Sequence, residues 1–170
     1  MRLLIDHGAD VNAQDESYTT PLHLSSFLGI PEIAQLLIER GANLTSQDWM
    51  HRTPLHMASS WVSSKTVLLS IQRRADVNGQ DDSIIISSNT ILPVKTATVR
   101  LLIDHGADVN AKDQTKSTPL HLASSVGSID TVRLLIDHGA EVTAQDVHRM
   151  TPLHMAFSWV SRESTLLFMQ

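Results

Sequence analysis

Short apolar runs return along this chain, and several of them end in the same way. Leu-Leu-Ile occurs at residues 3–5, 101–103 and 134–136, each time followed by Asp-His-Gly. A run that stops at glycine predicts a helix whose end adopts the left-handed backbone that glycine favours. The pattern therefore predicts one kind of helix that is used repeatedly.

A second kind of helix is predicted where the tetrapeptide Thr-Pro-Leu-His occurs, at residues 20–23, 53–56, 118–121 and 151–154. Threonine caps the free N–H groups of a helix start, and proline in the first turn loses no hydrogen bond. Each tetrapeptide is followed by small residues and then by an apolar stripe, as in residues 122–140. The unit is thus a helix pair with a turn, which buries its apolar faces only when stacked on its neighbours.

Aspartates mark the register of the repeat. Asp15, Asp48, Asp81, Asp113 and Asp146 are separated by 33, 33, 32 and 33 residues. A period of this length over several units is typical of a repeat array. The sequence therefore predicts a single array over residues 1–170, with a partial repeat at 1–14, repeats at 15–47 and 48–80, a degenerate repeat at 81–112, a repeat at 113–145 and a truncated repeat at 146–170.

The unit that begins at Asp81 lacks the tetrapeptide. Ile-Ser-Ser-Asn stands at 86–89 instead, and Pro93 falls where the first helix is expected. Proline inside a helix costs roughly 3 kcal/mol or more. One interpretation is a degraded repeat whose first helix is shortened or irregular, with the second helix resuming at about Thr98. The other is a non-repeat insertion, and in both cases we expect a weak point of the stack here.

Both ends of the chain lie within predicted second helices. Leu3 and Leu4, and likewise Leu166, Leu167 and Phe168, would leave apolar surface at the two ends of the stack. Uncapped stacks tend to associate. We therefore expect a piece of a longer array or a truncated product, with a tendency to self-association through its uncapped ends.

Composition narrows the function classes. The formal net charge is −5, and no basic run provides the electrostatic footprint of a nucleic-acid-binding protein. The apolar runs are too short to span a membrane, and the N-terminus lacks the apolar core of a signal peptide. The chain has no cysteine, which excludes disulfides, thiolate metal ligands and cysteine nucleophiles. We expect an intracellular protein, cytoplasmic or nuclear.

The 33-residue period, with "TPLHLAS" and "LLIDHGADVNAQD" and their variants, resembles the ankyrin repeat, whose signature includes Thr-Pro-Leu-His. The resemblance covers nearly the whole chain except a stretch near 82–97. It implies an all-α solenoid of stacked antiparallel helix pairs with β-turn loops. It also implies that the Thr and His side chains bond within and between neighbouring units. The residues concerned are Thr20, His23, Thr53, His56, Thr118, His121, Thr151 and His154.

A catalytic or metal-binding use of the nine histidines is disfavoured by their spacing. No pair has the His-x-x-x-His spacing that places two ligands on one helix face, and neither G-x-x-x-x-G-K nor G-x-S-x-G occurs. Polar residues recur here because the repeat recurs, whereas a catalytic site needs a unique constellation. We expect no enzyme activity, no metal and no cofactor.

The resemblance places partner binding at the turn tips and on the inner face of the first helices. Tryptophan and arginine are favoured interface anchors. For Trp61 and Trp159, packing between helices is the competing interpretation. The family usually has glycine where Tyr18, His51, Lys116 and Arg149 stand, so a different turn geometry is expected. The candidate partner-binding residues are Trp49, Met50, Arg52, Trp61, Val147, His148, Met150 and Trp159.

The prediction is thus a non-enzymatic scaffold that binds a protein partner of unknown identity through the turn tips and the concave inner-helix face. A preformed surface of this kind loses little entropy on binding. The alternative is a fragment of a larger ankyrin protein with no independent binding activity, and an enzyme is the third possibility.

Overall fold

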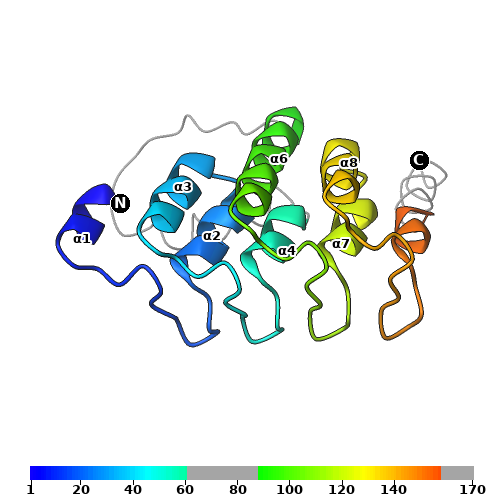
Figure 1. The fold of residues 1–170 in the computed structure, drawn as a ribbon, viewed down its shortest axis with the longest axis horizontal. Helices are drawn as coiled ribbons and strands as arrows, with labels where there is room; N and C mark the ends of the chain where they lie inside the picture. The colour runs from blue at the N-terminus through cyan, green and yellow to red at the C-terminus, as the bar shows by residue number, and fades with distance from the viewer. Residues whose placement is uncertain (61–87, 158–170) are drawn as a thin grey trace, which may run out of the picture.

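The computed structural model describes residues 1–60 and 88–157, with the side chains of 88–94 left out. The described chain is built of helices and turns, with no strand (Figure 1). This confirms the predicted all-helical solenoid. No described helix combines the length and apolar character needed to cross a membrane.

The helices form two layers. The inner layer contains α2 (Pro21–Leu28), α4 (Pro54–Ser59) and α7 (Pro119–Ser125), which begin at the Thr-Pro-Leu-His tetrapeptides. The outer layer contains α1 (Arg2–Asp6), α3 (Pro31–Glu39), α6 (Ser88–Asp104) and α8 (Ile129–Asp137). Residues 152–157 form a further helical segment after the fourth tetrapeptide. The turns project side by side from one edge of the layers (Figure 1).

The core lies between the two layers. In each described pair of an inner and an outer helix, each helix contributes one leucine to it. The tetrapeptide leucines Leu22, Leu55 and Leu120 are at most 1% exposed. The middle leucines of the outer runs, Leu37, Leu102 and Leu135, are buried to the same extent. Burying a leucine side chain is worth about 1.5–3 kcal/mol, so this repeated pair stabilises every interface of the stack.

The outer helix α6 begins earlier than expected. The second helix was expected to resume at about Thr98, but α6 begins ten residues earlier, at Ser88. It packs against α4 of the preceding tetrapeptide, and between α3 and α8 in the outer layer. The predicted boundary at residues 80–81 lies outside the described residues.

The inner helix α4 packs directly against α7, although the sequence places a further unit between them. The hydrogen bond from His56 Nε2 to the Ser117 carbonyl, 3.0 Å long, spans 61 residues. The equivalent bond from His23 spans 29 residues, to Arg52. The turn after α6 therefore lies beside the turn that contains Asp48, and the described helices form one uninterrupted stack.

Candidate interaction surface

Each turn is held by the aspartate that begins it. One carboxylate oxygen of Asp48 accepts from the N–H groups of Met50 and Arg52, both at 2.9 Å, and the Asp48 N–H donates to the Arg52 carbonyl at 3.0 Å. Asp15, Asp113 and Asp146 accept from the second and fourth residues after them in the same way. The four described turns therefore share one conformation, because each aspartate satisfies the same backbone donors.

The residue at the tip of each turn has a left-handed backbone. Tyr18, His51, Lys116 and Arg149 have φ between 58° and 60°. These are the positions where the resemblance suggested glycine and a changed geometry. These four residues instead adopt the left-handed backbone that glycine favours. This conformation costs roughly 1–2 kcal/mol for an ordinary L-residue. The turn conformation is preserved at the expense of local strain.

Neighbouring turns are linked by backbone hydrogen bonds. Trp49 N–H donates to the Ser17 carbonyl at 3.0 Å, and Gln114 N–H donates to the Met50 carbonyl at 2.9 Å. Val147 N–H donates to the Thr115 carbonyl at 2.9 Å. The four turns thus form a continuous row, which we call the turn row (residues 15–19, 48–52, 113–117 and 146–150).

The buried histidines connect the helix starts to the next turn. The Nδ1 atom of His23 accepts from the Thr20 N–H at 3.2 Å, and its Nε2 atom lies 3.0 Å from the Arg52 carbonyl. A carbonyl can only accept, so Nε2 carries the proton and the ring is neutral. His56 and His121 repeat the arrangement with Ser117 and Met150.

Burial reinforces the neutral state of these rings. It lowers the pKa of His23 and of His56 below the ordinary value, although the carbonyl acceptors oppose the shift. Both nitrogens of each ring are occupied by protein groups, which leaves no lone pair for a metal. Over the described part of the chain, no cluster of three potential metal ligands is present.

The fourth tetrapeptide keeps only the local half of this arrangement within the described residues. His154 Nδ1 lies 3.2 Å from the Thr151 nitrogen and 2.7 Å from its Oγ1. The ring is exposed, whereas the equivalent rings of His23, His56 and His121 are fully buried. The Thr–His contact therefore belongs to each helix start by itself, and burial depends on the neighbouring unit.

The turn row presents Trp49 and Val147 at equivalent positions, directly after an aspartate. Trp49 is 59% exposed and Val147 is 49% exposed. They are separated by the turn at 113–117, so the predicted candidates do not form one contiguous patch. Met50 and Met150 are half-buried, and His148 is exposed. Trp61 and Trp159 lie outside the described residues.

Arg52 contacts its own turn. Its Nε and Nη2 atoms lie 2.9 and 2.6 Å from Oδ2 of the buried Asp48. Burial alone would raise the pKa of Asp48, but the hydrogen bonds and charge of Arg52 outweigh it, so this pKa lies below its ordinary value. The geometry makes Arg52 a stabiliser of the turn at Asp48, with a partly exposed guanidinium.

Two asparagines that were not singled out from the sequence connect neighbouring units at the other end of the turns. Asn12 accepts from the Asn43 N–H at 2.8 Å and donates to the Gly41 carbonyl at 3.1 Å. Asn110 makes the same pair of bonds to Glu141 and Gly139. The recurrence of asparagine after Ala-Asp-Val was the signal in the sequence.

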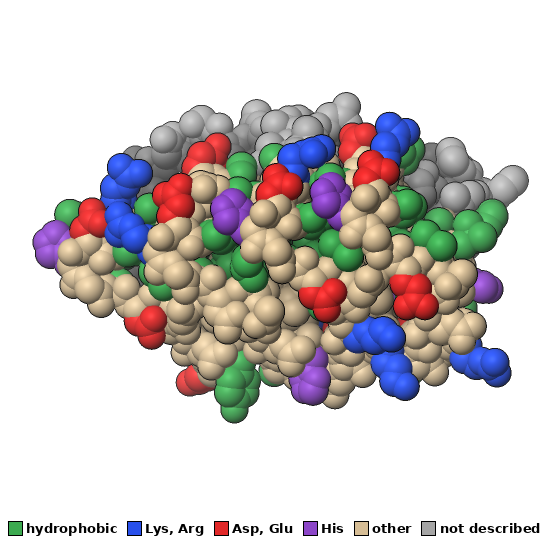
Figure 2. Space-filling view, viewed as in Figure 1, with side chains coloured by type: hydrophobic (Ala, Val, Ile, Leu, Met, Phe, Trp, Pro, Cys, Tyr) green, Lys and Arg blue, Asp and Glu red, His purple; other side chains and the backbone are tan. Residues whose placement is uncertain are grey.

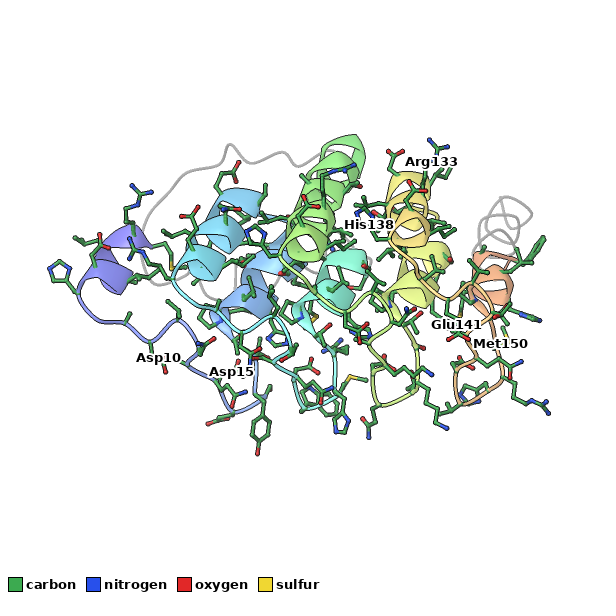
Figure 3. The ribbon with its side chains drawn as sticks, in the orientation of Figure 1. Asp10, Asp15, Arg133, His138, Glu141 and Met150 are labelled. Carbon is green, nitrogen blue, oxygen red and sulfur yellow. The ribbon has the colours of Figure 1, made fainter. Side chains whose placement is uncertain are left out.

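Charge is unevenly distributed along the turn row. The first turn carries Asp15 and Glu16 and no lysine or arginine, whereas each later turn carries its aspartate and one basic residue, which is Arg52, Lys116 or Arg149. Basic side chains accordingly gather toward the later turns at the lower edge of Figure 2. Figure 3 locates the first and last turns by Asp15 and Met150.

Two grooves lie away from the turn row. An apolar groove of about 620 Å³ runs between α7, α8 and residues 152–157, lined by side chains that include Ile129, Val132 and Leu153. A smaller polar groove of about 370 Å³ lies between α6 and α8. Arg133 and His138, labelled in Figure 3, line it together with Arg100, Asp130 and Asp137. Its opposite charges balance, so it favours neither an anion nor a cation.

Comparison with known proteins is consistent with this architecture. A family model described as ankyrin repeats (3 copies) matches residues 1–81 and 93–169. A comparison with curated proteins gives no match. The match covers most of the chain and leaves out residues 82–92, where the tetrapeptide is missing.

Proposed function

Because this chain belongs to the ankyrin-repeat family, whose repeats generally mediate protein–protein interaction, we propose that it is a non-enzymatic scaffold. It binds a protein partner through the turn row and the concave face formed by the inner helices α2, α4 and α7. Ankyrin-repeat proteins are typically scaffolds without catalytic activity. The absence of cysteine supports a place inside the cell, in the cytoplasm or nucleus.

The observation that carries this proposal is Trp49. This residue is 59% exposed, although its backbone is hydrogen-bonded to Ser17 in the preceding turn. An exposed tryptophan on a fixed backbone offers a large apolar contact at small entropic cost on binding. Tyr18, also 59% exposed, lies on the preceding turn and extends this apolar part of the row.

The charge distribution indicates the chemistry of the partner. A partner that contacts all four turns would place apolar groups against Tyr18 and Trp49. It would place acidic groups against Lys116 and Arg149 at the other end. Complementary charge sets orientation and association rate more than affinity, so these two residues would fix the direction in which the partner lies.

The proposal is tested by affinity capture from cell extract, with the wild-type chain and two single variants as bait. Trp49→Ala removes the proposed anchor, and Leu3→Ala is the control, because Leu3 is 70% exposed on α1 and distant from the turn row. We expect partners that are retained by the wild type and Leu3→Ala but lost with Trp49→Ala, at unchanged circular dichroism. Equal retention by all three baits would contradict the role of Trp49, and no specific retention would favour a fragment without independent binding activity.

A further inference from the structure

The two ends of the turn row present opposite charges to the solvent. At the first turn, Glu16 is exposed beside the exposed Asp15, and no lysine or arginine is present. At the fourth turn, Arg149 is exposed at the tip, whereas Asp146 is only 7% exposed and its carboxylate accepts backbone N–H groups. The charged side chains that face outward are therefore acidic at one end of the row and basic at the other.

The two middle turns present an aromatic ring and a cation. Trp49 of the second turn is 59% exposed, while the charge of Arg52 in the same turn is paired with the buried Asp48. Lys116 of the third turn is exposed at its tip. An ammonium group is attracted to the face of an aromatic ring, and most strongly to that of tryptophan. The second and third turns thus carry the two halves of a cation–π contact.

These groups have no use within the described part of the chain. No ion pair among the described residues involves Glu16, Lys116 or Arg149, and no cation–π contact there joins Trp49 to Lys116. Lys116 and Arg149 also have φ of 59° and 60°, a conformation that glycine would adopt without strain. A strained residue that keeps its side chain indicates a use for that side chain outside the fold.

The turn row is complementary to its own reversed copy. A two-fold axis perpendicular to the row, between the second and third turns, would place the first turn opposite the fourth turn of a second copy. Glu16 would then face Arg149, Trp49 would face Lys116, and each contact would occur twice. The turns project side by side from one edge of the layers and are linked by the same backbone bond, so all four can meet their counterparts together (Figure 1).

The charges also exclude the other two-fold arrangement. An axis parallel to the row would set each turn against the same turn of the second copy. Glu16 would then face Glu16, and Arg149 would face Arg149. Like charges placed opposite one another disfavour an interface. The order of charges along the row therefore selects the antiparallel arrangement.

We propose that the turn row binds the turn row of a second copy in an antiparallel two-fold dimer, with Glu16 against Arg149 and Trp49 against Lys116. The contact is confined to four turns, and each copy carries a formal net charge of −5, so the dimer is weak and forms at high concentration. It covers Trp49, so the dimer and the protein partner proposed above compete for one surface. This inference goes beyond the proposed function, which depends on the capture of a different protein.

The dimer is tested by exchanging charges between the two ends of the row. Glu16→Arg and Arg149→Glu each place like charges opposite one another in their own dimers, whereas a mixture of the two variants restores both ion pairs. One chain carries a fluorophore on Arg133→Cys, because the chain has no cysteine of its own and Arg133 lies in the outer layer, away from the turn row (Figure 3). Every chain also carries Leu3→Ser and Leu4→Ser, so that the exposed leucines of α1 do not contribute.

The measurement is the fluorescence anisotropy of the labelled Glu16→Arg chain as unlabelled chains are added, at low salt and at pH 8, where histidine is neutral. We expect Arg149→Glu to bind it at least fivefold more tightly than unlabelled Glu16→Arg does. A chain with both substitutions should bind itself as the wild type does, because opposite charges face one another again. Equal binding by the two single variants, or no binding in their mixture up to about 1 mM, would overturn the dimer. Neither result changes the capture experiment, which tests a partner from cell extract.

The contact between Trp49 and Lys116 is tested in the same assay with the wild-type charges at positions 16 and 149. Lys116→Met removes the ammonium group and keeps an unbranched side chain, so we expect self-association to weaken at least twofold, whereas Lys116→Arg should retain it. Arg100→Met is the matched control, because Arg100 is an exposed cation of α6 in the outer layer. Equal weakening by Lys116→Met and Arg100→Met would assign the effect to net charge and would overturn this contact.

Discussion

A substitution to glycine usually destabilises a protein, but at the strained turn tips we expect it to stabilise the fold. Lys116 has φ of +59° and an exposed side chain at the tip of the third described turn. Glycine in place of Lys116 would remove a left-handed penalty of roughly 1–2 kcal/mol. It would also add about 0.5–1 kcal/mol of backbone entropy to the unfolded chain. The net expectation is a stabilisation of about 0.5–1 kcal/mol from Lys116→Gly.

The measurement is the free energy of unfolding from urea titration at neutral pH, followed by circular dichroism. Lys116→Ala is the matched control for the lost charge and side chain, because alanine keeps the left-handed penalty. Gln114→Gly is the control for glycine itself, since Gln114 is an exposed residue of the same turn without a positive φ. We expect the free energy of unfolding of Lys116→Gly to be higher than that of the wild type. That of Lys116→Ala should be close to the wild-type value, and that of Gln114→Gly should be lower.

The reasoning would be refuted if Lys116→Gly and Gln114→Gly destabilised the chain equally. It would also be refuted if Lys116→Ala gave the full gain, because relief of charge and not of backbone strain would then be the cause. The same substitution at all four tips should add up to about 2–4 kcal/mol, since the tips lie on separate turns.

Three further predictions concern the histidine links and the exposed end of the stack. His56→Ala should destabilise the fold by about 2–4 kcal/mol in urea titration, because it leaves the Ser117 carbonyl without its buried donor and opens a cavity; a loss below about 1 kcal/mol would contradict this. Burial lowers the pKa of His23 and His56 in the folded state, so the unfolded chain binds more protons below pH 6.5. The contribution of the two rings to stability should therefore be fully present above pH 6.5. It should decline as the pH falls below 6.5, by up to about 1.4 kcal/mol per pH unit for each ring. Equal urea midpoints at pH 7.5 and 5.5 would refute the lowered pKa of these histidines. Leu3 and Leu4 are 70% and 63% exposed, so if the wild type self-associates, Leu3→Ser with Leu4→Ser should lower its average mass in sedimentation at high concentration.

Much of the local structure follows from short stretches of sequence. Thr-Pro-Leu-His predicts a helix start because threonine caps the first N–H groups and proline suits the first turn, and the family resemblance adds the bond between threonine and histidine. The structure places the Thr–His contact in all four tetrapeptides, including the exposed one at Thr151. Aspartate bonds within each turn are equally local. These features depend on spacing along the chain, which the sequence displays directly.

The candidate interaction surface was harder to predict, because exposure depends on neighbours. Trp49 and Arg52 stand three residues apart in one turn, yet the first is exposed and the second is paired with a buried carboxylate. The tip residues show a related difficulty. Their side chains suggested a changed turn, whereas the bonds to each aspartate hold the same left-handed backbone that glycine would adopt.

The sequence by itself determined that this chain is a repeating all-helical array, since helix starts, helix stops and turn aspartates are encoded within a few residues. Only the tertiary structure decided which repeat lies beside which. The packing of α4 directly against α7 could not be predicted from local signals, because a degenerate unit stands between them in the sequence. Leu102 in the core, Lys95 against Ser60 and α7 against α4 make this arrangement, and these contacts exist only when distant parts of the chain meet.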